Sequence, residues 1–448
     1  MKKFIDAFIN VWKIEELKNR ILVTLGLLLV YRFGAHVTLP GIDATKLNSL
    51  TTQTDSGIGW LIDVFTGGAF SQASVFALGI MPYISASIVV QLMGIAIPYL
   101  QKLQKEGESG RKKINQITRW LTIAITLVQG PGYIYNLYRT LPADAFMLGF
   151  DNFSFLFSAV VILTTGTIFA MWLGEKITDK GIGNGISLLI LIGIIARMPQ
   201  AFIQEFTSVV TENNGGPLKL LLEVALWIIV IIGCILLTMA VRKIPVQYAR
   251  RTTSGDFEQD AMGGNRQWIP LKLNASGVMP IIFAQAIMFI PAALAGLSKS
   301  EAAQTVTTQF QNVFGLAYNV VFALLIIIFT YFYTAITVPT NKMADDLKRS
   351  GGFIPGVRPG VETGDYLDRI MSLITFPGSL FLALIAVFPA IVVSLLGVQS
   401  QWALFYGGTS LLIMVGVAID TIQQINSYLL NRHYDGLMKS GKNRKAVA

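Results

Sequence analysis

The sequence is poor in the residues that carry chemistry. It has one cysteine and two histidines, and only 14% of its 448 residues are charged. A single cysteine excludes a disulfide within the chain and argues against a cysteine-based metal site. An enzyme in a membrane needs titratable groups at a protected site, whereas the charged residues in or beside the apolar runs lie near the ends of those runs. We therefore expect a chain that is not an enzyme, with no catalytic residue, no metal site and no cofactor.

Long apolar runs are what the sequence has instead. Hydrophobic residues make up 53% of the chain, which is typical of a polytopic membrane protein rather than a soluble domain. Ten runs are long enough to cross a bilayer as helices. They cover residues 21–38, 73–97, 117–137, 153–173, 182–202, 218–241, 275–297, 317–338, 370–396 and 402–425.

The distribution of Lys and Arg predicts the topology. These residues concentrate in every second segment between the apolar runs, and the remaining segments carry few of them. Positive charge is retained on the cytoplasmic side of membrane proteins. The alternation therefore predicts ten helices with both termini in the cytoplasm.

The ten spans divide into two sets of five at a polar Asn-Asn-Gly-Gly-Pro stretch over 213–217. Because five is odd, two halves with a shared fold are inverted relative to each other, and their interface is the natural path for cargo. We predict an all-α polytopic membrane protein with two inverted, pseudo-symmetric halves and a re-entrant helix. Its parts are a cytoplasmic segment 1–20, the halves 21–212 and 213–425, and a cytoplasmic tail 426–448.

Two apolar runs carry Gly and Pro at matching places. Gly-Ile-Met-Pro at 79–82 is followed by Tyr-Ile-Ser-Ala-Ser, and Gly-Val-Met-Pro at 277–280 opens the second run of the other half. Gly/Pro-interrupted segments at corresponding positions of two halves indicate where a transporter handles its cargo. The alternative is that Gly and Pro are simply common in membrane helices.

Isoleucines accompany these Gly-rich positions. Ile80 and Ile84 are four residues apart and so share one helix face, as do Ile186 and Ile190, and Ile282 follows the second Gly-x-Met-Pro. Stiff β-branched side chains in a ring could form an apolar constriction that excludes ions. The alternative is that each isoleucine faces lipid or an ordinary core.

The connection over residues 39–72 is unusually long. Its second part, about 61–71, is weakly apolar but too short to span, so it is a candidate re-entrant segment, which only surrounding protein or a water-filled cavity can tolerate. A surface turn is the alternative. The pair Gly67-Gly68 disfavours a stable helix, and we expect the segment to be only modestly packed.

Two further segments, 242–273 and 339–369, are basic, rich in Gly and long enough to form projecting hairpins. The first begins with a strand-like stretch at 246–251. The second ends in a rigid sequence of turns over 351–360.

Several motifs together resemble the SecY family, the channel subunits of the bacterial protein-translocation machine, over essentially the whole chain. They are Phe-Ala-Leu-Gly-Ile-Met-Pro-Tyr-Ile-Ser-Ala-Ser (76–87), Met-Trp-Leu-Gly-Glu (171–175), Gly-Ile-Gly-Asn-Gly-Ile-Ser (181–187), Leu-Lys-Leu-Asn-Ala-Ser-Gly-Val-Met-Pro (271–280), the turn at 352–360, and Phe-Tyr-Gly-Gly-Thr-Ser-Leu-Leu-Ile (405–413).

The resemblance implies a channel that passes unfolded secretory polypeptides across the membrane and releases hydrophobic segments sideways into lipid. It also implies four sets of functional residues. The pore ring falls on Ile80, Ile84, Ile186, Ile190, Ile282 and Ile413. The plug that closes the channel falls on about 61–71, with Leu61, Phe65, Gly67, Gly68 and Phe70.

The lateral gate implied by the resemblance lies between the second and seventh spans, with Ser85 and Phe289 at facing positions. Other polar residues on the two spans prefer partners or water over lipid; they are Ser87, Gln91, Asn274 and Gln285. The two basic loops match those that dock partners. The docking residues are Arg250, Arg251 and Arg358.

The partners implied are the subunits SecE and SecG, the motor ATPase SecA, the translating ribosome, nascent chains with signal sequences, and membrane lipid. The implied location is the inner membrane of a bacterium. A small-solute transporter is the alternative, but it would usually carry a midplane charge and does not need two basic loops. A ribosome-docking platform that binds RNA phosphate is a third reading, which leaves the Pro-bearing spans unexplained.

Overall fold

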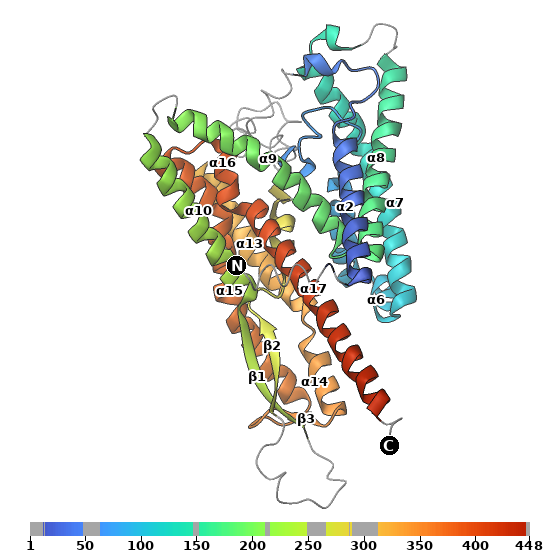
Figure 1. Cartoon of the computed structure of the whole chain (residues 1–448), viewed down its shortest axis with the longest axis vertical. Coiled ribbons are helices and arrows are strands. Elements are labelled where there is room, and N and C mark those ends of the chain that lie inside the picture. The colour runs from blue at the N-terminus through green and yellow to red at the C-terminus, as the bar shows by residue number, and fades with distance from the viewer. Residues whose placement is uncertain are drawn as a thin grey trace, which may run out of the picture. The chain divides into compact units, whose positions relative to one another are not determined.

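The computed structural model describes residues 12, 14–47, 63–146, 152–210, 216–248, 266–285, 287, 288 and 312–444 (Figure 1). The chain is a helical membrane protein, as predicted, and carries one small sheet. It divides into two compact units, one of Met1–Glu205 with Val417–Ala448 and the other of Phe206–Gly416.

The first unit is built from long helices. Residues 21–38, 117–137 and 153–173 were predicted to be apolar spans; the last two fall wholly on helices, and the first is helical up to Ala35. In chain order the helices of this unit are α2 (Glu15–Ala35), α5 (Met81–Ala96), α6 (Pro98–Lys105), α7 (Glu108–Thr140), α8 (Asn152–Lys180) and most of α9 (Gly185–Val210), with 3₁₀ turns at Ala44–Lys46 and Ala143–Ala145. The helix α8 packs on α2 and α7, and α7 also packs on α5.

The second predicted span is shorter than its apolar run. Residues 73–80 form turns, and the helix α5 begins at Met81. The cause is Pro82, which has no backbone N–H and is best tolerated in the first turn of a helix, where N–H groups have no helical partner anyway. Pro98 then ends α5 and opens α6. The prediction of one continuous helix over 73–97 is therefore wrong at its start.

The second unit combines spanning helices with a projecting hairpin. Its elements are α10 (Gly216–Met239), β1 (Val241–Tyr248), β2 (Arg266–Lys272), α13 (Leu316–Thr337), α14 (Thr340–Arg349), β3 (Gly352–Phe353), α15 (Val361–Leu396), α16 (Ser400–Ala403), a 3₁₀ turn at Leu404–Tyr406 and the start of α17 (Gly408–Arg444). The strands lie in the order β2-β1-β3, all antiparallel, with Val241 opposite Lys272.

The hairpin, α14, β3 and the first turns of α15 enclose a small core of their own (Figure 1). We call this part the loop module, residues 241–248, 266–272 and 340–371. Its core side chains are Ile244, Val246, Leu271, Leu347, Ile354, Leu367 and Met371. The predicted hairpin at 242–273 thus has its strands in the described residues, while 339–369, expected to be a loop, contains α14 and the first nine residues of α15.

Six helices of the described residues are long and apolar enough to cross a membrane, or seven if α5 and α6 count as one bent span. The helices α2 and α7 cover predicted spans but are not among these six, and the run 275–297 is described only at 275–285, 287 and 288. The count of ten spans therefore stays a prediction.

Candidate functional site

The predicted plug lies in the first unit, and its residues 63–71, which we call the plug segment, are described. A short helical turn at 63–66 is followed by Gly67 and Gly68, whose positive φ values of 65° and 92° end it. Side chains close the segment on itself: Asp63 Oδ1 accepts a hydrogen bond from the Ser71 N–H at 2.7 Å. Leu61 lies outside the described residues.

The plug segment is fully buried. Phe65 and Phe70 are 8% and 7% exposed, and the small residues between them are no more exposed than that. Tyr133 of α7 donates a hydrogen bond to the Phe70 carbonyl at 2.9 Å, and the two rings lie 4.9 Å apart. The expectation of modest packing is therefore wrong, because the glycines shorten the helix but do not loosen its surroundings.

Two arginines hold the plug segment from different helices. Arg197 of α9 pairs with the Asp63 carboxylate and donates to Ser71 Oγ at 2.6 Å. Arg32 of α2 donates to the Gly67 carbonyl oxygen at 2.7 Å. A buried carboxylate is costly unless it is paired and hydrogen-bonded, and Asp63 is both. We call these contacts the arginine latch.

Burial raises the pKa of the Asp63 carboxyl above its ordinary value, and the guanidinium of Arg197 opposes that effect. The side chain of Asp63 is 5% exposed and that of Arg197 is 25% exposed. The carboxylate is thus shielded from water, and its charge is stabilised by the guanidinium of Arg197 and by the hydrogen bond from the Ser71 N–H.

The plug segment also touches the two helices that carry predicted ring residues. A side-chain carbon placed on Gly193 of α9 would stand 2.8 Å from the Phe65 carbonyl oxygen, so only glycine fits there. One placed on Gly79 would stand 2.9 Å from the Thr66 methyl carbon. Gly79 directly precedes Ile80, and Gly193 follows Ile190 by three residues. The segment therefore lies beside the start of α5 and the third turn of α9.

The pore-ring residues occur in both units. In the first unit, Ile80 is the residue before α5 and its carbonyl accepts from the Ile84 N–H at 3.0 Å, so the two stand one turn apart. Ile186 and Ile190 are in the first two turns of α9. In the second unit Ile282 lies in a helical stretch at 279–285 and Ile413 in the second turn of α17. Their assembly into one ring stays a prediction.

Four of the predicted gate residues make hydrogen bonds to near neighbours in the chain. Ser85 donates to the Met81 carbonyl at 3.1 Å, and Gln91 donates to Ser87 Oγ at 3.3 Å, both within α5. In the second unit Asn274 accepts from Ser276 Oγ at 3.3 Å, and Gln285 is buried. Phe289 lies outside the described residues, so the proposed facing pair stays a prediction.

Of the three predicted docking residues, the structure describes only Arg358. Arg250 and Arg251 lie outside the described residues. Arg358 is on the turn before α15, and its side chain is 88% exposed, with the Glu362 carboxylate 3.7 Å away. Thr363 Oγ1 donates to the Arg358 carbonyl at 2.8 Å, which fixes the backbone and leaves the guanidinium in solvent.

Sequence reasoning missed most of the arginine latch. Arg197 lies inside the run 182–202 and inside α9. A charge within an apolar run is rare and usually paired inside the protein, and this signal could have found it. Its partner Asp63 is 134 positions away, and no local pattern connects the two.

Comparisons with known proteins agree on one family. The model of the SecY family matches residues 74–422. A protein translocase subunit SecY from Streptomyces scabiei is 39% identical over 446 residues, covering 97% of this chain and all of that one. Another from Aquifex aeolicus is 39% identical over 441 residues, covering 98% of this chain and all of that one.

Solved structures share the fold. One concerns the plug domain of a SecY protein, which is said to stabilise the closed state of the translocation channel and maintain a membrane seal; it aligns with a TM-score of 0.59 at 18% identity over 92% of each chain. The canine Sec61 of a ribosome–channel complex aligns with a TM-score of 0.54 at 18% identity, again over 92% of each chain.

Proposed function

The chain belongs to the SecY family of protein translocase subunits, and from this premise we propose how its residues divide the work of the channel. The protein is a protein-conducting channel in a membrane and is not an enzyme. What is proposed is the role of each part: the plug segment closes the channel, the isoleucines seal it, two spans open sideways, and the loop module binds partners.

The plug segment closes the channel when nothing is being translocated. The observation that carries this proposal is the arginine latch together with the contacts at Gly79 and Gly193, because these fasten a short, non-spanning segment beside the start of α5 and the third turn of α9. A solved relative attributes a membrane seal to its plug domain. Opening then requires the Arg197–Asp63 pair to separate.

The isoleucines form the seal through which a moving chain passes. Stiff apolar side chains around a narrow passage exclude hydrated ions by dewetting and yet fit loosely around a polypeptide. Translocated chains are unfolded and secretory, and their hydrophobic segments leave sideways between the second and seventh spans, where Ser85, Ser87, Gln91, Asn274, Gln285 and Phe289 lie.

Partners bind at the loop module. Its exposed basic turn at Arg358 supports a cytoplasmic docking surface for the ribosome and for the motor ATPase SecA. We propose that Arg250 and Arg251, which lie between β1 and β2 in the sequence, contribute to it. The canine relative was solved in a ribosome–channel complex. SecE and SecG complete the translocase, which lies in the inner membrane of a bacterium with both termini of this chain in the cytoplasm.

The plug proposal is tested by Asp63→Asn, which removes the charge that Arg197 binds. We expect a closed channel that leaks, so ion conductance in planar bilayers rises at least tenfold while the protein still inserts. Asp144→Asn is the matched control, because Asp144 forms a similar 2.7 Å pair with Lys46 but is 69% exposed. Equal conductance of the two variants would refute the role of the plug segment.

A further inference from the structure

The turn 181–184 joins α8 to α9 in the first unit and lies just before Ile186 of the predicted pore ring. The turn is buried except at Asn184. Its Gly183 has a positive φ of 83°, which glycine adopts without strain. Because α9 begins where this turn ends, the positions of Ile186 and Ile190 depend on how the turn is held.

Side chains of two other helices bind buried N–H groups of this turn. Thr24 Oγ1 of α2 accepts a hydrogen bond from the Ile182 N–H at 3.0 Å, and Gln424 Oε1 of α17 accepts one from the Gly183 N–H at 2.8 Å. We call Thr24 and Gln424 the turn clasp. A buried N–H group without a partner is costly, so each acceptor holds the turn to its own helix.

The two helices of the turn clasp also meet beside the turn. Arg20 of α2 donates to the Gly181 carbonyl at 3.4 Å, and its guanidinium lies 5.2 Å from the centre of the Tyr428 ring on α17. A side-chain carbon placed on Gly183 would stand 3.1 Å from Thr421 Oγ1 of α17. The turn is therefore enclosed by α2 and α17 and has little room to move.

The turn in turn sets the position of Ile186. Asn184 Oδ1 accepts hydrogen bonds from the N–H of Ile186 at 3.1 Å and of Ser187 at 3.4 Å, which caps the first turn of α9. A side-chain carbon placed on Gly174 of α8 would stand 2.9 Å from Ile186 Cγ1, so this isoleucine lies against α8. Ile190 follows on the same helix face. A displacement of the turn therefore displaces both isoleucines.

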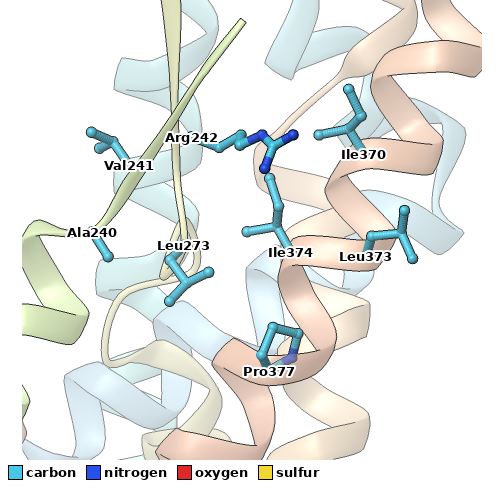
Figure 2. A pocket seen from close by; sticks show the side chains of 8 residues that line it. All are labelled: Ala240, Val241, Arg242, Leu273, Ile370, Leu373, Ile374 and Pro377. Carbon is cyan, nitrogen blue, oxygen red and sulfur yellow. The ribbon is translucent and has the colours of Figure 1, made fainter.

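The connection before Ile282 in the second unit is held differently. Leu273 donates its N–H to the Ala240 carbonyl at 2.9 Å, and a side-chain carbon placed on Gly378 of α15 would stand 2.9 Å from the Leu273 carbonyl oxygen. Figure 2 shows Leu273 between Ala240 and α15. Backbone groups make these contacts, whereas the turn before Ile186 is held by side chains that a substitution can remove.

We propose that Thr24 and Gln424 are positioning residues for the pore seal, because they fix the turn 181–184 and so hold Ile186 and Ile190 where they exclude ions. The inference rests on the proposed role of the isoleucines. A constriction that excludes ions by dewetting has to stay narrow, so a small displacement of two isoleucines is enough to let ions pass. If the turn clasp only stabilised the fold, its loss would lower thermal stability and leave the inserted channel sealed.

The test measures idle conductance in planar bilayers, with the full chain purified together with the subunits that accompany it. Thr24→Val removes one acceptor with little change of shape, and Gln424→Met removes the other with a side chain of similar length. We expect each change to raise the conductance of the inserted channel about three- to tenfold. Thr24→Ser and Gln424→Glu keep an acceptor oxygen and should restore the seal.

Each substitution has a matched control. Thr122 Oγ1 on α7 donates to the carbonyl one turn before it at 2.8 Å, as Thr24 Oγ1 does at 2.9 Å. Thr122→Val therefore loses the same bond within a helix but leaves the turn untouched. Gln423→Met changes the exposed neighbour of Gln424 on α17. Both controls should conduct like the unaltered protein, and thermal unfolding of every variant reports its stability.

The proposal is overturned if Thr24→Val and Gln424→Met seal as well as the unaltered protein while Ile190→Asn leaks. It is also overturned if Thr24→Ser leaks as much as Thr24→Val, or if the controls leak equally. A sealed channel in Ile190→Asn would instead refute the seal itself, and this inference with it. Should Thr24→Val fail to insert, Gln424→Met decides the matter, because Gln424 is exposed and its loss leaves the core intact.

Discussion

The plug segment and the loop module use arginine in opposite ways. Arg197 reaches into protein and binds a carboxylate that is 5% exposed, whereas Arg358 is 88% exposed and its nearest carboxylate, on Glu362, is 3.7 Å away. The first arginine holds two distant segments of the chain together. The second lies on a backbone turn that is fixed by a hydrogen bond, and its guanidinium extends into solvent. Within the described residues, its ion pair with Glu362 leaves most of its N–H donors available.

The two arginines differ in energy because water reaches the Arg358 ion pair but is largely excluded from the Asp63 carboxylate. Removing one member of a buried ion pair leaves an uncompensated charge and costs about 3–5 kcal/mol, while an exposed pair contributes only about 0–1 kcal/mol. Arg197 is therefore suited to hold the plug segment in place through an ion pair that is costly to break. Arg358 is suited to an external contact, because its charge is already solvated and costs the fold little.

The sharpest test of this contrast is a pair of double-mutant cycles. For Asp63→Asn and Arg197→Gln, we expect each single change to destabilise the closed channel by about 3–5 kcal/mol and the double change to cost less than their sum. For Arg358→Gln and Glu362→Gln, we expect a coupling of no more than about 0.5 kcal/mol. Conductance of the idle channel reports the first cycle, and thermal unfolding reports the second. Similar couplings in both cycles would remove the contrast.

The loop module should depend on its apolar core rather than on its charges. Leu367 is fully buried there, so Leu367→Ala should destabilise the module by about 2–5 kcal/mol. Faster hydrogen exchange in β1 and β2 would show this. Leu373→Ala, six residues further along the same helix and 67% exposed, is the control and should change little. Idle conductance should stay normal in both variants.

The sequence predicted the helical class because it follows from local composition, and the same composition marks 61–71 as a short stretch that cannot span. Apolar runs, alternating basic segments and a short, glycine-bearing stretch all lie within windows of about 20 residues. One strand of the hairpin was signalled in part: the strand-like stretch at 246–251 overlaps β1 at 246–248, whereas β1 begins at Val241.

The parts that could not be predicted depend on pairings across the chain or on polar helices. The contacts of Arg32 and Arg197 with the plug segment join helices far apart in sequence. The helix α14 was missed because, of its ten residues, only Ala344 and Leu347 are buried, which leaves almost no apolar stripe. The late start of α5 at Met81 was missed because hydropathy does not register a proline in the first turn.

Close packing gives a second way to disturb the plug segment without touching charge. Gly193→Ala would place a carbon 2.8 Å from the Phe65 carbonyl oxygen and 3.2 Å from the Gly67 nitrogen, and such overpacking costs about 1–3 kcal/mol. We expect a moderate rise in idle conductance, smaller than that of Asp63→Asn. Gly26→Ala on α2 is the control, since nothing lies within 4 Å of its new carbon. Equal conductance in these two variants would show that the plug segment does not need the close approach of α9.

The smallest effects should come from substitutions of Arg358. These substitutions distinguish two roles for the residue, which are to set the membrane topology and to bind partners. Positive charge keeps a loop in the cytoplasm whatever the loop does, and Lys preserves that charge but lacks the planar fork that binds carboxylate or phosphate in two places. Arg358→Lys should therefore insert in the normal orientation, with normal thermal stability, yet lower SecA-driven translocation and ribosome binding about threefold. Arg358→Glu should lower them further, and the remaining binding should weaken as salt rises, because exposed charges are screened beyond about 10 Å at 0.1 M salt.

Lys342→Gln on the exposed surface of α14 is a control for general loss of charge. If Arg358→Glu translocates at the unaltered rate, this arginine serves topology alone. The proposal that the loop module is the docking surface would then be refuted.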